Sequence, residues 1–323
     1  MDTVLGCLVT DSIGPGEYTE KLIKNGKDVF KYDAAVALRS PYTALQLAIA
    51  QLGLSTHARI GISALAPMYH SMAIEALGHE AVFYDHDPEY GNISDDPNLK
   101  ACDAAVLFSP FGIPVNVAFA QALGIPTIED ITHSLGSLGQ EAENGCIGSL
   151  GIYAMEQGAL VTAGGGALLF APSRKTSPIV RNLAERISPE TAMTDYNAAL
   201  GLAKIRDFPD ILERRRALAE MFRGETARTR HKVLGGMEEL ARGLTGFPIL
   251  LESSMKDTVI HAKRNGVETA PAFESSIVSQ DGFPENQCKG AKSLALRCLQ
   301  FPLHEKISAK DANLIKKVIA TLP

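Results

Sequence analysis

Residues 126–139 read Pro-Thr-Ile-Glu-Asp-Ile-Thr-His-Ser-Leu-Gly-Ser-Leu-Gly. The short apolar run that ends in Glu129-Asp130 is typical of a buried parallel strand, which delivers a carboxylate to the carboxyl edge of an α/β sheet. Because open α/β sheets bind their ligands at that edge, the stretch predicts both an α/β fold and a ligand site beside Asp130.

The same pattern extends outward from this strand. Between about residues 35 and 170, short β-branched runs alternate with amphipathic segments, which indicates βαβ units and a mainly parallel sheet. The expected strands are 58–64, 81–84, 104–109, 126–129, 150–155 and 166–170. The expected helices between them are 41–52, 69–77 and 115–123.

Beyond residue 175 the helices become longer, at 194–205 and 208–223. A strand at 247–251 and helices at 255–265 and 309–320 follow, and Ser308 with Asp311 forms a capping box at the start of the last one. This alternation predicts a small α/β domain packed on the large one. We place the boundary near residue 205, giving a large domain of residues 1–205 and a small domain of residues 206–323.

Composition limits the class of partner. The chain has 323 residues, 46% hydrophobic and 21% charged, with a formal charge of −6, so a small metabolite is a better partner than nucleic acid or an anionic membrane. Five scattered cysteines without C-x-x-C spacing indicate neither a disulfide framework nor a zinc site. No basic leader and no apolar run of about 20 residues occur, so we expect a cytoplasmic protein.

Six segments, in order, carry a resemblance to a known family: 36–45, 66–70, 82–88, 128–136, 193–202 and 299–304. Among them, 82–88 reads Val-Phe-Tyr-Asp-His-Asp-Pro and 128–136 reads Ile-Glu-Asp-Ile-Thr-His-Ser-Leu-Gly. Together they resemble the DegT/StrS-type sugar aminotransferases, which use pyridoxal phosphate (PLP) and have the aspartate-aminotransferase fold, type I.

The resemblance implies a fold, an activity and partners. The large domain should have three α/β/α layers around a mostly parallel seven-stranded sheet, with a small C-terminal α/β domain. The family transfers an amino group from a donor such as glutamate to a keto-sugar, with PLP or pyridoxamine phosphate (PMP) as cofactor. A homodimer with a nucleotide-sugar substrate is therefore expected.

The resemblance also assigns cofactor-binding residues. Asp130 should lie against the pyridine nitrogen and keep the ring protonated, although a helix cap at a strand end would also explain it. His133 should bind the phenolic oxygen or the phosphate, and an isolated histidine is often structural. Tyr69 or, alternatively, His70 should stack on the ring, and either could be plain packing.

The phosphate should bind at the start of the 41–52 helix, near Ser40 and Thr43, where free N–H groups and the helix dipole favour an anion. Simple capping explains Ser40 equally well. Pro41-Tyr42 replaces the family's glycine there, and Pro41 has no N–H to donate. Residues 190–192, Glu-Thr-Ala, replace the family's Asn-x-Arg, which removes a phosphate contact from the neighbouring subunit.

The largest departure concerns the Schiff-base lysine. No lysine occurs between Lys100 and Lys175. The counterpart of the family's lysine is Ala159, with Gly158 or Gln157 as the other options, and none of the three can form an imine or move a proton.

Three readings follow from that departure. The lysine was replaced to trap a substrate, or the chain is a natural lysine-less relative that binds PLP or PMP non-covalently, or it is a cofactor-free binding or scaffold protein on the same fold. The further changes at 41–42 and 190–192 favour the last two readings, whereas the retained Asp130 and His133 favour an occupied site.

Overall fold

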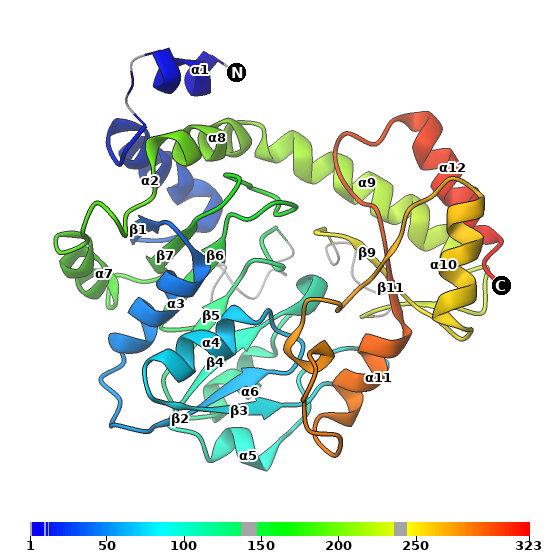
Figure 1. Cartoon of the computed structure of the whole chain (residues 1–323), viewed down its shortest axis with the longest axis horizontal. Helices are drawn as coiled ribbons and strands as arrows, with labels where there is room; N and C mark the ends of the chain where they lie inside the picture. Colours follow the sequence, from blue (N-terminus) through cyan, green and yellow to red (C-terminus); the bar gives the residue numbers. More distant parts are fainter. Residues whose placement is uncertain (1, 10, 12, 137–146, 236–243) are drawn as a thin grey trace.

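The computed structural model describes residues 2–9, 11, 13–136, 147–235 and 244–323. Two sheets organise this part of the chain (Figure 1). Strands β1 to β7, between residues 34 and 171, form a seven-stranded sheet, and strands β8 to β11, between residues 232 and 301, form a four-stranded one.

The large sheet has a single reversed strand. In spatial order its strands are β1 (Ala34–Leu38), β7 (Ala167–Ala171), β6 (Leu150–Ala154), β5 (Thr127–Asp130), β4 (Ala104–Phe108), β2 (Arg59–Ser63) and β3 (Glu80–Tyr84). Neighbouring strands are parallel except where β7 pairs with β1 and β6. The prediction of a mostly parallel seven-stranded sheet is confirmed.

Helices cover both faces of this sheet. One layer is α3 (Pro41–Ala50), α4 (Tyr69–Ala76) and α7 (Ser177–Ala184); the other is α2 (Glu17–Phe30), α5 (Pro97–Lys100), α6 (Val117–Ala122) and α8 (Asp195–Arg206). Successive residues of a strand point to opposite faces of the sheet and pack against different helix layers. Leu169 of β7 packs in the α3/α4 core, and Phe170 packs in the α2/α8 core. The three-layer prediction is therefore confirmed.

Strand register decides which layer Asp130 faces. Asp130 pairs with Phe108 of β4 on one side and with Ile152 of β6 on the other. Both neighbours belong to the core beneath α3 and α4. Because cross-strand partners share a face, the Asp130 carboxylate points toward the α3/α4 layer.

The C-terminal part has its own sheet and core. Its antiparallel strands are, in spatial order, β10 (Ala270–Pro271), β11 (Cys298–Phe301), β9 (Phe247–Leu250) and β8 (Lys232–Val233). Its helices are α9 (Phe208–Thr226), α10 (Met255–Arg264), α11 (Lys289–Arg297) and α12 (Ala309–Ala320), with short 3-10 turns at Ile277–Ser279 and, in the large domain, Pro110–Gly112. α8 ends at Arg206 and α9 begins at Phe208, and the domain boundary near 205 stays a prediction.

The expected helices and strands form within a few residues of the ranges inferred from sequence. Ser308 caps α12 as predicted, its hydroxyl accepting from the Asp311 N–H at 3.1 Å. The sequence pattern did not anticipate α2, α7, α11 or the N-terminal helix α1 (Asp2–Val9), which packs against α8. Within the described ranges, no helix is long and apolar enough to cross a membrane.

Candidate functional site

The first turn of α4 brings two side chains to the Asp130 carboxylate. The Tyr69 hydroxyl donates to Oδ2 of Asp130, and Nε2 of His70 lies 2.9 Å from the same oxygen. Asp130 and His70 are both fully buried, and Tyr69 is partly exposed. Both candidates that the sequence offered for ring stacking therefore meet Asp130, as hydrogen-bond partners of one oxygen.

Thr132 donates to the other oxygen of Asp130, Oδ1. This residue was not identified from the sequence. Its backbone N–H donates to Oδ1 at 2.9 Å, and its hydroxyl donates to the same atom. That hydroxyl also accepts from the Ala154 N–H at 2.9 Å, which ties the group to the end of β6. A threonine two residues after an aspartate at a strand end is the turn pattern that could have indicated this role.

The four contacts use the full acceptor capacity of Asp130. An ionised carboxylate offers about four lone-pair sites. Oδ2 takes donors from Tyr69 and His70, and Oδ1 takes two from Thr132. A further donor at Asp130 therefore requires that one of these four leaves.

The electrostatics agree with an ionised aspartate and a neutral phenol. Burial raises the pKa of Asp130, but hydrogen bonds from His70, Thr132 and Tyr69 outweigh it, and the pKa falls below its ordinary value. Burial, followed by the negative charge of Asp130, raises the pKa of Tyr69 well above its ordinary value. Tyr69 therefore remains an O–H donor across the physiological range.

His133 lies beside this network among aromatic rings. Its ring centroid is 5.0 Å from that of Phe108 and 5.6 Å from that of Phe111, and its Nδ1 accepts from the Phe111 N–H at 3.4 Å. Burial lowers the pKa of His133, against the opposing effect of the Asp130 charge. The ring is therefore neutral near pH 7, and because Nδ1 is an acceptor, the proton lies on Nε2.

Ser40 and Thr43 meet at the N-terminus of α3. The Ser40 hydroxyl accepts from the Thr43 N–H at 3.1 Å and lies 2.9 Å from the Thr43 hydroxyl. Ser40 therefore caps α3, as the alternative explanation of this residue expected. Arg39, just before this turn, donates its backbone N–H to Thr191 at 3.0 Å, which places the 190–192 segment beside the same turn.

Ala159 packs in the core of the α2/α8 layer, with Leu22 and Ile131. The residue is 8% exposed. Gly158 has a positive φ of 91°, with open space where a side chain would begin, and Gln157 is exposed. The described contacts join Asp130, Tyr69 and His70 directly, and they do not include Ala159 in that network.

Three buried polar atoms near these strand ends have no partner among the described residues: Nδ1 of His70 and the hydroxyls of Ser109 and Ser134. Ser109 directly follows β4, and Ser134 follows β5. Buried polar atoms are nearly always hydrogen-bonded in folded proteins. The carboxyl edge of β4 and β5 is thus the part of the site with polar groups to offer.

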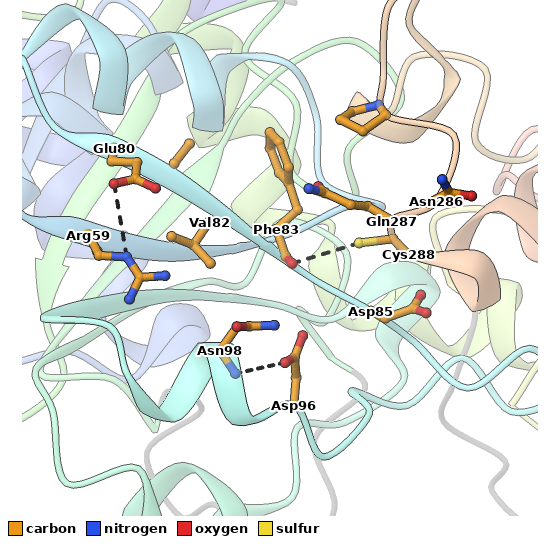
Figure 2. Close-up of a pocket in the computed structure, with 12 residues that line it drawn as sticks. Arg59, Glu80, Val82, Phe83, Asp85, Asp96, Asn98, Asn286, Gln287 and Cys288 are labelled. Carbon is orange, nitrogen blue, oxygen red and sulfur yellow. Dashed lines mark hydrogen bonds and ion pairs between the residues drawn. The ribbon is translucent and has the colours of Figure 1, made fainter.

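A separate cavity of about 530 Å³ lies along the edge strand β3 (Figure 2). None of the sequence-predicted site residues lines it. Asp85 at its rim accepts from the N–H groups of Gly290 and Ala291, at 3.0 and 2.8 Å, and so caps α11. Burial raises the pKa of Cys288 to about 12, which keeps that thiol protonated. We therefore locate the candidate site at Asp130 and not in this cavity.

The sequence profile of the DegT/DnrJ/EryC1/StrS aminotransferase family matches residues 1–322. The chain belongs to this family. Membership agrees with the Asp130 strand end and with the expected resemblance.

One curated relative is a Bacillus subtilis (strain 168) protein, EpsN, named as a pyridoxal phosphate-dependent aminotransferase. It is 23% identical over 163 residues, which is 42% of this chain and 42% of that relative. The matched part thus spans less than half the length of the curated relative.

Two solved structures show the shared fold. A Streptococcus pneumoniae protein named as a sugar aminotransferase, in its PMP form, is 16% identical, with a TM-score of 0.89 over 99% of this chain and 94% of that chain. The E. coli GDP-4-keto-6-deoxy-D-mannose-3-dehydratase with bound hydrated PLP is 17% identical, with a TM-score of 0.85 over 98% of this chain and 95% of that chain. At these identities the likeness shows the fold.

Proposed function

We propose that this chain is a lysine-less member of its family that binds PMP or PLP non-covalently at Asp130 and acts on a sugar-type substrate. The observation that carries the proposal is the buried Asp130 at the end of β5, whose pKa is lowered by its hydrogen bonds, combined with a sequence that holds no lysine from 101 to 174. A buried aspartate stays charged where hydrogen-bond donors surround it, and the N–H of a protonated pyridine ring is such a donor.

The described residues fit such a cofactor if one of the four donors to Asp130 leaves. Asp130 would hold the pyridine nitrogen once one present donor leaves, and the α3 N-terminus at Ser40 and Thr43 would face the phosphate. The unpaired hydroxyls of Ser109 and Ser134 supply further polar contacts at the same edge. The neutral His133 offers its Nε2–H as a donor to a cofactor oxygen.

Each residue then has a task of its own. When bound, the protonated ring of the cofactor withdraws electrons from the substrate carbon that carries nitrogen. Asp130 would keep that ring protonated, and His70 and Thr132 hold the carboxylate in place. Ala159, at the counterpart of the lysine, can supply neither a covalent link nor a proton relay, so any proton transfer depends on another group or on water.

Substrate and assembly follow the family. The relatives named as sugar enzymes support a keto-sugar, as a nucleotide sugar, with an amino-acid donor such as glutamate.

We also propose a homodimer, supported by exposed apolar side chains at Leu5 and Leu8 on α1 and by the family's shared sites. Unpaired thiols at Cys7, Cys102, Cys288 and Cys298 support a reducing, cytoplasmic setting. A monomer in sedimentation at micromolar concentration contradicts the dimer.

Calorimetric titration with PMP and with PLP tests the proposal. We expect saturable binding of one or both, with an absorbance spectrum that borohydride does not fix to the chain. Mass spectrometry should find no pyridoxyl-lysine after reduction. Such an adduct on any lysine shows that another residue forms the imine, and no binding at all removes the proposal.

One observation favours a second function. Asp130 already has two donors on each oxygen within the chain. A strand-end aspartate that is satisfied by its own protein fits a cofactor-free binding or scaffold protein on the same fold. The PMP titration separates the two functions, because a cofactor-free scaffold protein should bind no PMP.

A further inference from the structure

The three residues that donate to Asp130 differ in how firmly the fold holds them. Thr132 is two residues along the chain from Asp130, and its hydroxyl is also bound by the Ala154 N–H. His70 is fully buried within α4, with its ring 5.8 Å from that of Phe108. Both residues are therefore fixed by the packing around them.

Tyr69 differs from them in place and exposure. It is the first residue of α4, and it is partly exposed. Residues at a helix start have no preceding turn of the same helix to pack against. A rotation of this side chain would release Oδ2 of Asp130 and needs no change in the backbone of α4 or β5.

We propose that the Tyr69 phenol is an internal substitute for the cofactor's ring N–H: it holds Asp130 in the cofactor-free protein and swings away when the pyridine ring binds. This inference rests on the proposed function. It assigns to Tyr69 a role different from the ring stacking that the sequence suggested. Ring and phenol compete for one oxygen, so the strength of the Tyr69 bond sets the affinity for the cofactor.

The exchange has a measurable consequence. The Tyr69→Phe variant keeps the aromatic ring and loses only the competing O–H. Because hydrogen bonds to charged groups are among the stronger ones in proteins, PMP should bind about tenfold to a hundredfold more tightly. In the absence of PMP the same variant should be less stable than the natural chain, because Asp130 loses a donor. These opposite effects distinguish a competitor from a merely structural tyrosine.

The control is Tyr32→Phe. Tyr32 likewise donates its hydroxyl to an acceptor within the chain, the Ile23 backbone carbonyl, but it is buried and packs in the α2/α8 core. Its loss should lower stability and leave PMP affinity unchanged. Calorimetric titration with PMP and thermal unfolding without PMP are measured for both variants and for the natural chain.

Each outcome decides the inference and separates it from the proposed function. Binding by the natural chain that tightens in Tyr69→Phe supports both. Binding that stays equal or weakens in Tyr69→Phe overturns the inference and leaves the proposed function standing. Binding by Tyr69→Phe alone supports the inference and shows that the natural chain keeps its site closed, which overturns the proposed function. Absence of binding by both folded proteins overturns both.

Discussion

At the scale of single residues, His86 is a buried titratable group outside the candidate site. It is 1% exposed, its Nε2 lies 2.7 Å from the Ser63 hydroxyl, and its Nδ1 lies 2.8 Å from the Gly91 carbonyl oxygen. Burial lowers its pKa from 6.5 to about 4, so the folded protein holds the neutral ring.

This pKa predicts a stability loss in mild acid. Because the folded pKa lies below the unfolded one, the stabilisation is fully present above pH 6.5 and is lost as pH falls through about 4. The shift corresponds to about 3 kcal/mol. The His86→Gln variant should therefore lose less stability between pH 7.5 and 4.5 than the natural chain, as measured by urea unfolding. The control is His304→Gln at an exposed position, and an equal pH slope in all three proteins contradicts the role of His86.

Ala159 allows a direct test of the missing lysine. If residue 159 is the family's lysine position, Ala159→Lys should take up PLP covalently, seen as a visible absorbance band and, after borohydride, as an adduct on that residue. Ala159→Met, of similar length, should form no adduct. Because Ala159 is 8% exposed in a packed core, both variants should lose stability, by about 1–3 kcal/mol. If the Ala159→Lys protein folds but forms no adduct, the counterpart of the family's lysine is Gly158 or Gln157 instead.

At the scale of elements, α2 shows how a helix can depend on a distant residue. Its sequence contains Asn25-Gly26, a pair that usually indicates a turn. The carboxylate of Asp195, at the start of α8, accepts from the N–H groups of Tyr18 and Thr19 at 3.1 and 2.8 Å. The helix start is thus capped by a side chain from another helix, which no local pattern reveals.

The N-terminus of α3 can be tested against a matched cap. Ser40 caps α3 and Ser308 caps α12 with the same geometry, each hydroxyl accepting at 3.1 Å from the N–H three residues on. Ser40→Ala and Ser308→Ala should each cost about 1 kcal/mol of unfolding free energy in urea titrations. If the cofactor phosphate binds at α3, only Ser40→Ala should also weaken PMP binding. Equal PMP affinity of both variants places the phosphate elsewhere.

At the scale of the whole molecule, Glu305 joins the large domain to the C-terminal part. It accepts from Lys204 of α8 at 2.6 Å and from Arg215 of α9 at 3.0 Å. Burial raises the pKa of Glu305, but hydrogen bonds from Lys204, from its own backbone N–H and from Arg215 outweigh burial and bring the pKa from 4.5 to about 2. The folded pKa is the lower one, so this stabilisation is present above pH 4.5 and is lost as pH falls through about 2.

The Glu305→Gln variant should lose roughly 1 kcal/mol of unfolding free energy at pH 7, a modest value because solvent screens this partly exposed cluster. It should also show a flatter stability profile between pH 4.5 and 2, a window below that of His86. The control is Glu252→Gln, whose ion pair with Arg297 is exposed on both sides. Unfolding free energies are measured by denaturant titration across this pH range. If the two variants show the same dependence of stability on pH, the contribution of Glu305 is contradicted.

Several features could be predicted from the sequence alone. The alternation of apolar runs placed the parallel strands, the Glu129-Asp130 pair placed a carboxylate at a strand end, and the stretch from 101 to 174 showed the absence of lysine. These are properties of short segments: side-chain periodicity, caps and composition act over a few residues, so a pattern reveals them before any packing is known.

The tertiary structure alone decided what surrounds that carboxylate. Tyr69 and Asp130 are 61 residues apart, and they meet because the register of β5 with β4 and β6 turns Asp130 toward the layer that contains α4. The same packing assigns Tyr69 and His70 to one carboxylate oxygen and puts Ala159 in the core of the opposite layer. Which donor reaches a buried acceptor depends on strand order and helix packing across the whole domain, and a linear pattern does not contain that information.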